Sequence, residues 1–372
     1  MDIPNKSKFA GQPVLIRIDL NLPLTKTGEI ISGGAHSRLA LALREIKFWL
    51  ELGSPITLIT HWGKPNQPNR QLSTARLAPL LATALNHPVR FIAEPITTTS
   101  TTTSVTKSTS GEIRLLENLR FSPGETANDL AFATTLIQGQ SIYVNNAFSV
   151  SHRNHASIAL IPTLLPSFLG QLTLAEVDAL KSAPDHSLVV VGGNQLLPKL
   201  PALIALASHQ SRLFLAGNLC LPMLANRGLG ITPEFQSSKA EALAASQLVG
   251  AWGNRLILPT DFVELETSGE ILDIGPESIA IIKSLIDQHR TVIWNGPLGQ
   301  VENLSGQAST IAIGKHLNNH PVSYATIGGG STTTLLDNND LLKNITHVSS
   351  GGGAMLMYLS GASLPGLAPF NL

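Results

Sequence analysis

The stretch VLIRIDLNLPL, residues 14–24, contains the pattern on which the fold of this chain depends. Apolar side chains alternate with polar ones and lead into a polar cluster at Asp19, which is typical of a strand that runs into a loop. Residues 38–52 then place apolar side chains at helical spacing, and Gly53 supplies a C-terminal stop. Residues 55–61 predict the next strand. A strand, a helix and a second strand in succession predict a βαβ unit of a parallel sheet.

This alternation of short apolar runs with helical patterns continues through most of the chain and favours an α/β fold with parallel sheets. In such sheets, ligands bind in the loops beyond the carboxyl ends of the strands. Further strands are predicted at residues 141–144, 187–191, 212–215, 255–258, 291–294 and 323–327. Glycine-rich or polar clusters follow the predicted strands at residues 19–23, 61–65, 192–199, 295–299 and 328–334.

The bulk composition excludes several classes of protein. Only 13% of the 372 residues are charged, and 25 basic residues balance 25 acidic ones, which excludes a generally basic nucleic-acid binder and an acidic disordered chain. The most apolar runs are far shorter than the ~20 residues of a membrane span, and the N-terminus lacks the apolar core of a signal peptide. Cys220, the single cysteine, allows no internal disulfide and fits a reducing compartment. The sequence therefore predicts a soluble cytoplasmic protein without nucleic-acid or membrane partners.

The chain is too long for one ordinary hydrophobic core, so it predicts two domains. A helical pattern near mid-chain, residues 166–184, is expected to join two lobes of similar size. The predicted N-terminal lobe spans residues 1–168, the joining helix 169–184, the C-terminal lobe 185–355 and the tail 356–372. Residues 97–110 are almost entirely Ser and Thr and predict a flexible surface loop, with a modification site as the less favoured alternative.

No single loop identifies the chain, which has no Walker A, GxGxxG, HExxH or GxSxG motif. The order of its loops, however, resembles the phosphoglycerate kinase family over nearly the whole length. Besides residues 14–24 and the triplet SRL (37–39), the matching blocks are THWGKP (60–65), LLENLRFSPGE (115–125), YVNNAFSVSHRNHAS (143–157), VGGNQLLPK (191–199), LDIGP (272–276), WNGPLGQVE (294–302), IGGGSTTT (327–334), SSGGGAM (349–355) and LPG (364–366). So many blocks in one order make coincidence negligible.

The resemblance implies two doubly wound parallel-sheet lobes, Rossmann-like and joined by the mid-chain helix, with the tail of residues 356–372 returning to the N-terminal lobe. It implies reversible phosphoryl transfer from 1,3-bisphosphoglycerate to ADP, giving 3-phosphoglycerate and ATP, with Mg²⁺ bridging the nucleotide phosphates. It also implies a monomer whose lobes close to bring the two ligands together.

On the phosphoglycerate side, a substrate with carboxylate and phosphate groups requires fixed cations, and the planar fork of arginine suits both anions. By the resemblance, Asp19 and Asn21 hold the substrate hydroxyl and carboxylate, and Arg38 neutralises charge on the transferred group. The side chains that would grip the distal phosphate are His61, Arg120 and Arg153, with Lys64 where the family usually has arginine. Taken alone, each arginine would read as an exposed ion-pair partner and the histidine as a capped core residue.

On the nucleotide side, the family uses two lysines in a glycine-led loop, which correspond here to Gln195 and Lys199. The resemblance makes Lys199 a catalytic residue. Ser331 replaces the family's acidic residue that binds the metal complex, and its hydroxyl is a neutral ligand. The other nucleotide-binding matches are Gly193, Gly217, Asn295, Pro297, Glu302, Gly329, Gly330 and Thr332, and the site of the transferring phosphate matches Gly351, Gly352 and Gly353 at the start of a predicted helix. Without the resemblance, these glycines would read as ordinary turns.

Three functions remain open at this point: a phosphoglycerate kinase of reduced activity, a pseudokinase that binds 3-phosphoglycerate as a sensor or scaffold, and a kinase for another small phosphorylated acid. Losing one preorganised charge costs about 10²–10³ in rate. The choice between the first two functions therefore depends on how much activity is lost at Gln195 and Ser331, which replace charged residues of the family. His152 and His155 have the spacing of metal ligands, but no third ligand is apparent and we expect no metal there. Asn146 stands where the family usually has aspartate, and we expect it to be structural.

Overall fold

The computed structural model describes residues 6–25, 27–31, 33–34, 37–65, 67–93, 109–209, 211–226 and 237–372. The chain divides into two compact units, Met1–Asp178 with Ser363–Leu372, and Ala179–Ala362. The predicted Ser/Thr-rich loop at residues 97–110 lies outside the described residues except for Thr109 and Ser110.

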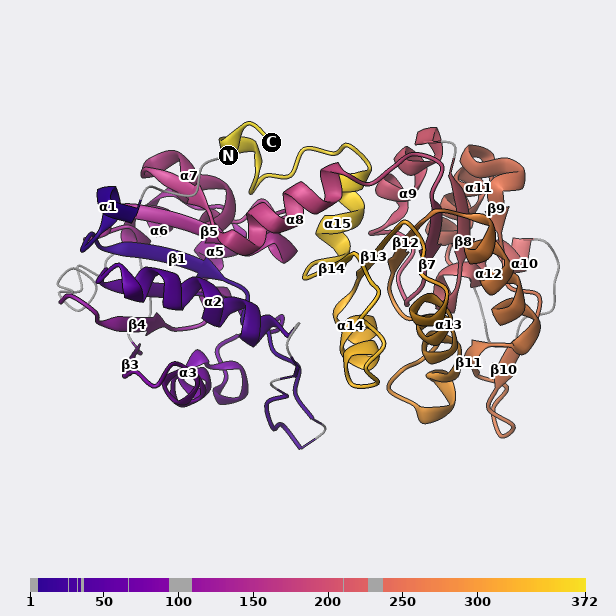
Figure 1. Ribbon diagram of the computed structural model, residues 1–372, viewed down its shortest axis with the longest axis horizontal. Coiled ribbons are helices and arrows are strands. Elements are labelled where there is room, and N and C mark those ends of the chain that lie inside the picture. Colours follow the sequence, from indigo (N-terminus) through magenta and orange to yellow (C-terminus); the bar gives the residue numbers. More distant parts are fainter. Residues whose placement is uncertain are drawn as a thin grey trace. The chain divides into compact units, whose positions relative to one another are not determined.

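A six-stranded parallel sheet forms the centre of the first unit, in the order β3-β4-β2-β1-β5-β6. Figure 1 labels four of these strands, β1, β3, β4 and β5. Its central strand β1 (Val14–Ile18) pairs with β2 (Ile56–Ile59) on one side and with β5 (Ile142–Asn146) on the other. The outer strands are β4 (Ile113–Leu116), β3 (Val89–Ile92) and β6 (Ser167–Leu169). Because the strand order reverses at β1, the loops after β1, β2 and β5 meet at a topological switch point.

Both faces of β1 are buried, as a parallel sheet requires. Ile16 and Ile18 pack in one cluster with α2 (Arg38–Glu51) and α3 (Leu77–Leu85), whereas Leu15 packs in another with α6 (Leu130–Leu136). The two-residue alternation of the strand therefore fixes which side chains face each helical layer.

Helix α2 illustrates how local sequence positions a functional side chain. The hydroxyl of Ser37 accepts a hydrogen bond from the backbone N–H of Ala40 at 3.2 Å, which caps the helix and starts it at Arg38. Leu39, Ile46 and the other apolar side chains at helical spacing face the core. Arg38 therefore stands in the first turn of a helix held in place by its buried face.

The second unit repeats the architecture with the order β14-β13-β12-β7-β8-β9 (Figure 1). These strands are β7 (Leu188–Val191), β8 (Arg212–Leu215), β9 (Leu256–Ile257), β12 (Thr291–Asn295), β13 (Tyr324–Gly328) and β14 (His347–Ser349). Leu188 and Val190 of β7 share a buried cluster with Ile282 of α12 (Pro276–Gln288) and Ile313 of α13 (Ala308–Asn319). The central strand β7 again lies where the strand order reverses, so its loop is a switch point of this sheet.

Other elements complete the two units. Helix α9 (Leu200–Leu206) packs on α11 (Lys239–Trp252), where the indole N–H of Trp252 donates to the carbonyl of Leu203 at 2.8 Å. The remaining elements of the described residues are α1 (Lys6–Phe9), α5 (Pro123–Thr126), α7 (Ile161–Leu164), α8 (Gln171–Lys181), α10 (Leu221–Asn226), α14 (Gly330–Asp337), α15 (Gly352–Leu359), the antiparallel pair β10 (Phe262–Glu264) and β11 (Ile271–Ile274), and short helical turns.

The predicted fold class is confirmed: both units are α/β with a parallel sheet. The mid-chain segment differs in one respect, because residues 166–184 do not form one helix. Residues 167–169 pair with β5 as strand β6, and α8 begins only at Gln171. Between them, a side chain at Gly170 would lie 2.3 Å from the amide oxygen of Asn146, so the glycine allows the close approach at which the strand ends.

The last residues of the chain belong to the first unit. The side-chain amide of Asn145 donates to the carbonyl of Gly366 at 3.0 Å, and the N–H of Gly366 donates to the carbonyl of Ser151 at 2.8 Å. Leu364 and Leu367 are buried. Residues 363–372 are thus an integral part of the first unit's packing.

Candidate functional site

Three loops at the switch point of the first sheet hold most of the predicted phosphoglycerate ligands. Asp19 follows β1, His61 follows β2, and Ser149 lies in the turn η4 (Phe148–Val150) after β5. Because these strands are neighbours in a parallel sheet, their carboxyl ends bring the three side chains to one edge.

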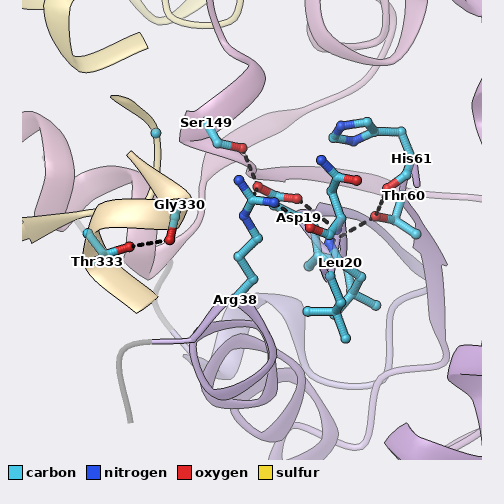
Figure 2. A network of polar contacts seen from close by, with 12 residues as sticks. Asp19, Leu20, Arg38, Thr60, His61, Ser149, Gly330 and Thr333 are labelled. Atoms are coloured by element: carbon cyan, nitrogen blue, oxygen red, sulfur yellow. Dashed lines mark hydrogen bonds and ion pairs between the residues drawn. The ribbon is translucent and has the colours of Figure 1, made fainter. Parts of the chain in front are cut away.

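Asp19 is the centre of a polar network at this edge (Figure 2). One carboxylate oxygen accepts from the N–H of Asn21 at 2.9 Å, and the other accepts from the hydroxyl of Ser149 and lies 3.1 Å from Nε of Arg38. Burial alone would raise the pKa of Asp19, but the charge of Arg38 and these hydrogen bonds lower it to about 2. Asp19 is therefore a buried carboxylate that stays ionised at neutral pH.

Asn21 and Arg120 fix the neighbouring loop from two sides. The amide oxygen of Asn21 accepts from the N–H of Gly63 at 2.7 Å, and Arg120 donates to the carbonyl of Gly63. Arg38 in turn donates to the carbonyl of Asn21. The structure thus joins the predicted residues Asp19, Asn21, Arg38 and Arg120 through direct contacts or one shared loop.

Positive groups gather around this network. Burial, then the charges of Arg17 and Arg153, lower the pKa of Arg120 to about 10. The pKa of His152 falls to about 4, through burial and then the charge of Arg153. Mutual repulsion among cations at a fixed geometry is relieved by a bound anion, so this edge is suited to bind a phosphate or carboxylate.

Two predicted positions lie at the margin of this site. Lys64 is exposed, in keeping with a flexible point charge rather than a fixed fork. In Arg153, Nε is buried without a hydrogen-bond partner among the described residues, which leaves a donor for a ligand. Asn146, which is expected to be structural, accepts through its amide oxygen from the N–H of Leu172 at the start of α8 at 2.9 Å, while its amide nitrogen is buried without a hydrogen-bond partner among the described residues.

Sequence reasoning missed the buried layer beneath these ligands. Arg17 donates through Nε to the hydroxyl of Ser157 at 3.0 Å and lies 3.1 Å from Nδ1 of His61. Ser157 in turn donates to Glu125 through its hydroxyl at 2.6 Å and its N–H at 3.0 Å. The sequence feature that could have indicated this layer is Arg17, because a charged side chain inside the apolar strand VLIRI requires hydrogen-bond or charge partners.

In the second unit, the predicted nucleotide-binding loops pack backbone against backbone. A side chain at Gly192 would lie 1.9 Å from the carbonyl oxygen of Pro297, and one at Gly217 would lie 2.7 Å from the carbonyl oxygen of Gly193. One at Gly329 would lie 3.1 Å from the N–H nitrogen of Gly296, and one at Gly352 would lie 2.7 Å from the amide nitrogen of Asn295. These glycines are therefore required for the loops after β7, β8, β12 and β13 to meet the N-terminus of α15.

Lys199 stands within these loops. Its ammonium donates to the carbonyl of Gly192 at 2.7 Å, and burial lowers its pKa to about 8. Side chains at Gly193 or Gly296 would each lie 3.4 Å from this nitrogen, so the two glycines flank it. A partly desolvated ammonium beside bare backbone is suited to contact a phosphate.

Two polar atoms in the same loops are buried and have no partner among the described residues: the amide nitrogen of Asn295 and the hydroxyl of Thr332. Such atoms in native structures call for an explanation, of which a ligand is one. Gln195, Ser331 and Glu302 are exposed instead. The structure therefore brings together Gly193, Gly217, Asn295, Gly329 and Lys199. The side chains of Gln195, Ser331 and Glu302 lie on the surface.

The close packing of Gly192 predicts a clear effect on stability. Gly192→Ala is expected to lower the free energy of unfolding by about 1–3 kcal/mol, because the added methyl overpacks the loop against Pro297. Gly250→Ala is the matched control, since nothing lies within 4 Å of a side chain there and helix α11 would gain about 0.5–1 kcal/mol. Thermal and denaturant unfolding of both variants measure the effect. Equal stability of the two variants would contradict the packing of these loops.

A protein-family model described as phosphoglycerate kinase matches residues 5–362. The chain belongs to the phosphoglycerate kinase family. A phosphoglycerate kinase of Sinorhizobium fredii is 32% identical over 388 residues, which cover 96% of each chain. One of Frankia alni is 33% identical over 396 residues and 98% of each chain. Hence the alignment with phosphoglycerate kinases extends over both units.

Solved structures show the same relationship. The phosphoglycerate kinase of Pyrococcus horikoshii superposes with a TM-score of 0.85 at 25% identity, over 100% of this chain and 98% of the other. That of Coxiella burnetii gives a TM-score of 0.75 at 28% identity, over 98% and 97%. The resemblance read from the ordered loops is therefore confirmed.

Among the described residues, no helix combines the length and apolar character that a membrane crossing requires. The same residues contain no group of three or more His, Cys, Asp or Glu side chains arranged to hold a metal ion. His155 lies 3.8 Å from Glu125 through Nδ1, and burial, followed by the charges of Arg120, Arg17 and Arg153, lowers its pKa to about 4.

Proposed function

We propose that this chain catalyses reversible phosphoryl transfer between 1,3-bisphosphoglycerate and ADP. The bond between phosphorus and the acyl oxygen breaks, a bond to the terminal phosphate oxygen of ADP forms, and 3-phosphoglycerate and ATP result. The observation that carries the proposal is the cationic edge of the first sheet, where Arg17, Arg38, Arg120 and Arg153 gather around the ionised Asp19. Membership of the phosphoglycerate kinase family supports it over the whole chain.

The proposed substrate contacts follow from this edge. The N-terminal lobe, residues 1–168, would bind phosphoglycerate. Asp19 can accept a hydrogen bond from the substrate hydroxyl, while Asn21 lies beside it to hold the carboxylate. Arg38 would stabilise charge on the transferred group, as an arginine does in related transfers. The groups proposed for the distal phosphate are His61, Lys64, Arg120 and Arg153.

The C-terminal lobe, residues 185–355, would bind ADP and ATP. Lys199 would contact the phosphate chain, and the N-terminus of α15 offers backbone N–H groups for the transferring phosphate. The proposed nucleotide contacts are Gly193, Gly217, Asn295, Pro297, Glu302, Gly329, Gly330 and Thr332, with Gly351, Gly352 and Gly353 for the transferring phosphate. The unpaired buried amide of Asn295 and hydroxyl of Thr332 favour a ligand here.

Magnesium is the expected partner of the nucleotide. It prefers one or two carboxylates together with substrate phosphates and water. Residues 192–199, 295–299 and 328–334 contain no Asp or Glu, and Ser331 offers only a neutral hydroxyl. These loops do not fit a metal held by protein carboxylates, so we propose that Mg²⁺ would arrive on the nucleotide's own phosphates.

A coupled assay with 1,3-bisphosphoglycerate and MgADP tests the function. Turnover well above that of Lys199→Ala is the expected result. Turnover no higher than that variant, together with calorimetric binding of 3-phosphoglycerate, would instead support the pseudokinase, for which none of the comparisons gives evidence. We also propose that the chain acts as a cytoplasmic monomer, which sedimentation of the purified protein and fractionation of its native cells would test.

We expect kcat to rise when the family's two charged residues are restored. Gln195→Lys with Ser331→Asp is expected to raise kcat about tenfold or more, because each restored charge acts on the nucleotide phosphates or their metal. Steady-state kinetics with saturating 3-phosphoglycerate measure the change, and Gln300→Lys with Ser305→Asp is the control for added charge. An unchanged rate would mean that these two positions do not face the nucleotide.

A further inference from the structure

Arg17 is the fourth of the five residues of β1, and only 1% of it is exposed. Its guanidinium has three contacts in the first unit: with the hydroxyl of Ser157 at 3.0 Å, with the carbonyl of Ile18 at 2.8 Å, and with Nδ1 of His61 at 3.1 Å. A guanidinium has only N–H donors and keeps its proton in proteins. Arg17 is therefore a donor in each of these contacts.

This fixes the state of the histidine ring. The contact of Arg17 with Nδ1 of His61 is a hydrogen bond only if Nδ1 carries a lone pair, since a proton there would set two N–H groups against each other in a buried place. The ring proton then lies on Nε2, and the imidazole is neutral. In the described part of the chain, Nε2 of His61 makes no hydrogen bond, so its N–H is available to a ligand.

We propose that Arg17 is a positioning residue for phosphoglycerate, which holds His61 as the neutral tautomer whose Nε2–H donates to the anionic substrate. The proposal rests on the proposed function for the identity of the ligand. The state of the ring itself follows from contacts within the first unit.

The contacts of Glu125 explain why one N–H group of the Arg17 guanidinium is free to contact His61. This carboxylate is fully buried, but it accepts from the hydroxyl and N–H of Ser157 rather than from the guanidinium. The charge of Arg17 is thus balanced through one intervening hydroxyl. Among the described residues, no carboxylate forms an ion pair with Arg17, and one of its terminal nitrogens is left to face His61.

The charges around His61 also favour its neutral form. Burial and the charge of Arg17 hold the pKa of His61 well below its ordinary value, Asp19 acts in the opposite direction, and Arg120 and Arg38 add to the lowering. A neutral donor suits this place, because it binds an anion without adding one more charge to a set of arginines that already repel one another.

Nitrogen NMR of the histidine rings tests the state of His61 in the ligand-free protein, with His61→Gln to assign its signals. The wild type is expected to show a protonated Nε2 and an unprotonated Nδ1 from pH 5.5 to 8.5. Glu125→Gln keeps the guanidinium and is expected to keep this pattern. Arg17→Met would leave Glu125 uncompensated, so the test variant is Arg17→Met with Glu125→Gln, in which the pKa of His61 should rise above its wild-type value, because one lowering charge is gone while burial, Arg120 and Arg38 still act.

Binding provides the second measurement. In the double variant, Kd for 3-phosphoglycerate at pH 7.5 is expected to rise about tenfold relative to Glu125→Gln, as expected for one lost hydrogen bond to a charged group. Arg17→Lys with Glu125→Gln retains a cationic donor and should recover part of the affinity. Arg212→Gln, an exposed arginine of the second unit, is the control for lost charge.

A wild-type His61 that titrates near its ordinary value, or carries its proton on Nδ1, would overturn the proposal. So would a double variant with the altered ring state and unchanged affinity, because the tautomer would then have no part in binding. The NMR result does not depend on turnover. A chain that lacks kinase activity but shows the expected ring state would overturn only the proposed function.

Discussion

Arg38→Ala is expected to lower kcat by about 10³–10⁵, the range that one transition-state arginine contributes in related phosphoryl transfers. Arg38 stands in the first turn of α2, and its Nε lies 3.1 Å from the carboxylate of Asp19. Its charge is thus fixed in place before the substrate arrives. Steady-state kinetics with 1,3-bisphosphoglycerate and MgADP measure the loss.

Two controls separate this effect from damage to the helix. Arg44→Ala removes an exposed arginine from the same helix and should leave kcat within about twofold. Arg38→Lys keeps the charge without the planar fork and should fall between wild type and Arg38→Ala. A small loss in Arg38→Ala, comparable with that of Arg44→Ala, would show that Arg38 does not act on the transferred group.

Lys199→Ala has the second-largest expected effect, a fall in kcat of about 10²–10³, because it removes the one retained lysine of the glycine-led loop. The pH dependence gives a sharper signature. Burial lowers the pKa of Lys199 from 10.5 to about 8, so the wild type should lose its ammonium charge as the pH rises through 8. Affinity for ADP, measured by calorimetry from pH 7 to 9, should weaken in the wild type and change far less in the variant.

Stability provides the control for this variant. Below pH 8 the folded protein holds a buried ammonium that the unfolded chain would solvate, so the free energy of unfolding rises with pH between about 8 and 10.5. Lys199→Ala removes this dependence and should not lower Tm at pH 7. A variant that is both inactive and much less stable would indicate a structural role for Lys199.

Local patterns predicted those parts of the fold that depend on neighbours in sequence. The apolar spacing of residues 38–52 and the stop at Gly53 describe α2 within one residue, and residues 212–215 match β8. Strands β3, β4, β6 and β14 and the antiparallel pair β10 and β11 were missed. Their pairing partners lie elsewhere in the chain, so the local pattern does not contain them.

The candidate site was predicted where its residues stand in recognisable loops, and not where distant residues meet. Ser149 bonds Asp19 across 130 positions, and Ser157 bonds Arg17 across 140. Only the paired strands β1 and β5 bring those loops together. A buried arginine in a strand indicates that polar partners exist. The sequence around it does not tell which histidine it contacts.

The return of residues 363–372 to the first unit has a consequence for synthesis on the ribosome. The second unit, Ala179–Ala362, is continuous in the chain and can finish folding as soon as it has emerged. The first unit cannot, because Gly366 completes the hydrogen bonds of Asn145 and Ser151 more than two hundred residues later in translation. We therefore expect the half of the protein that is made first to reach its native state last.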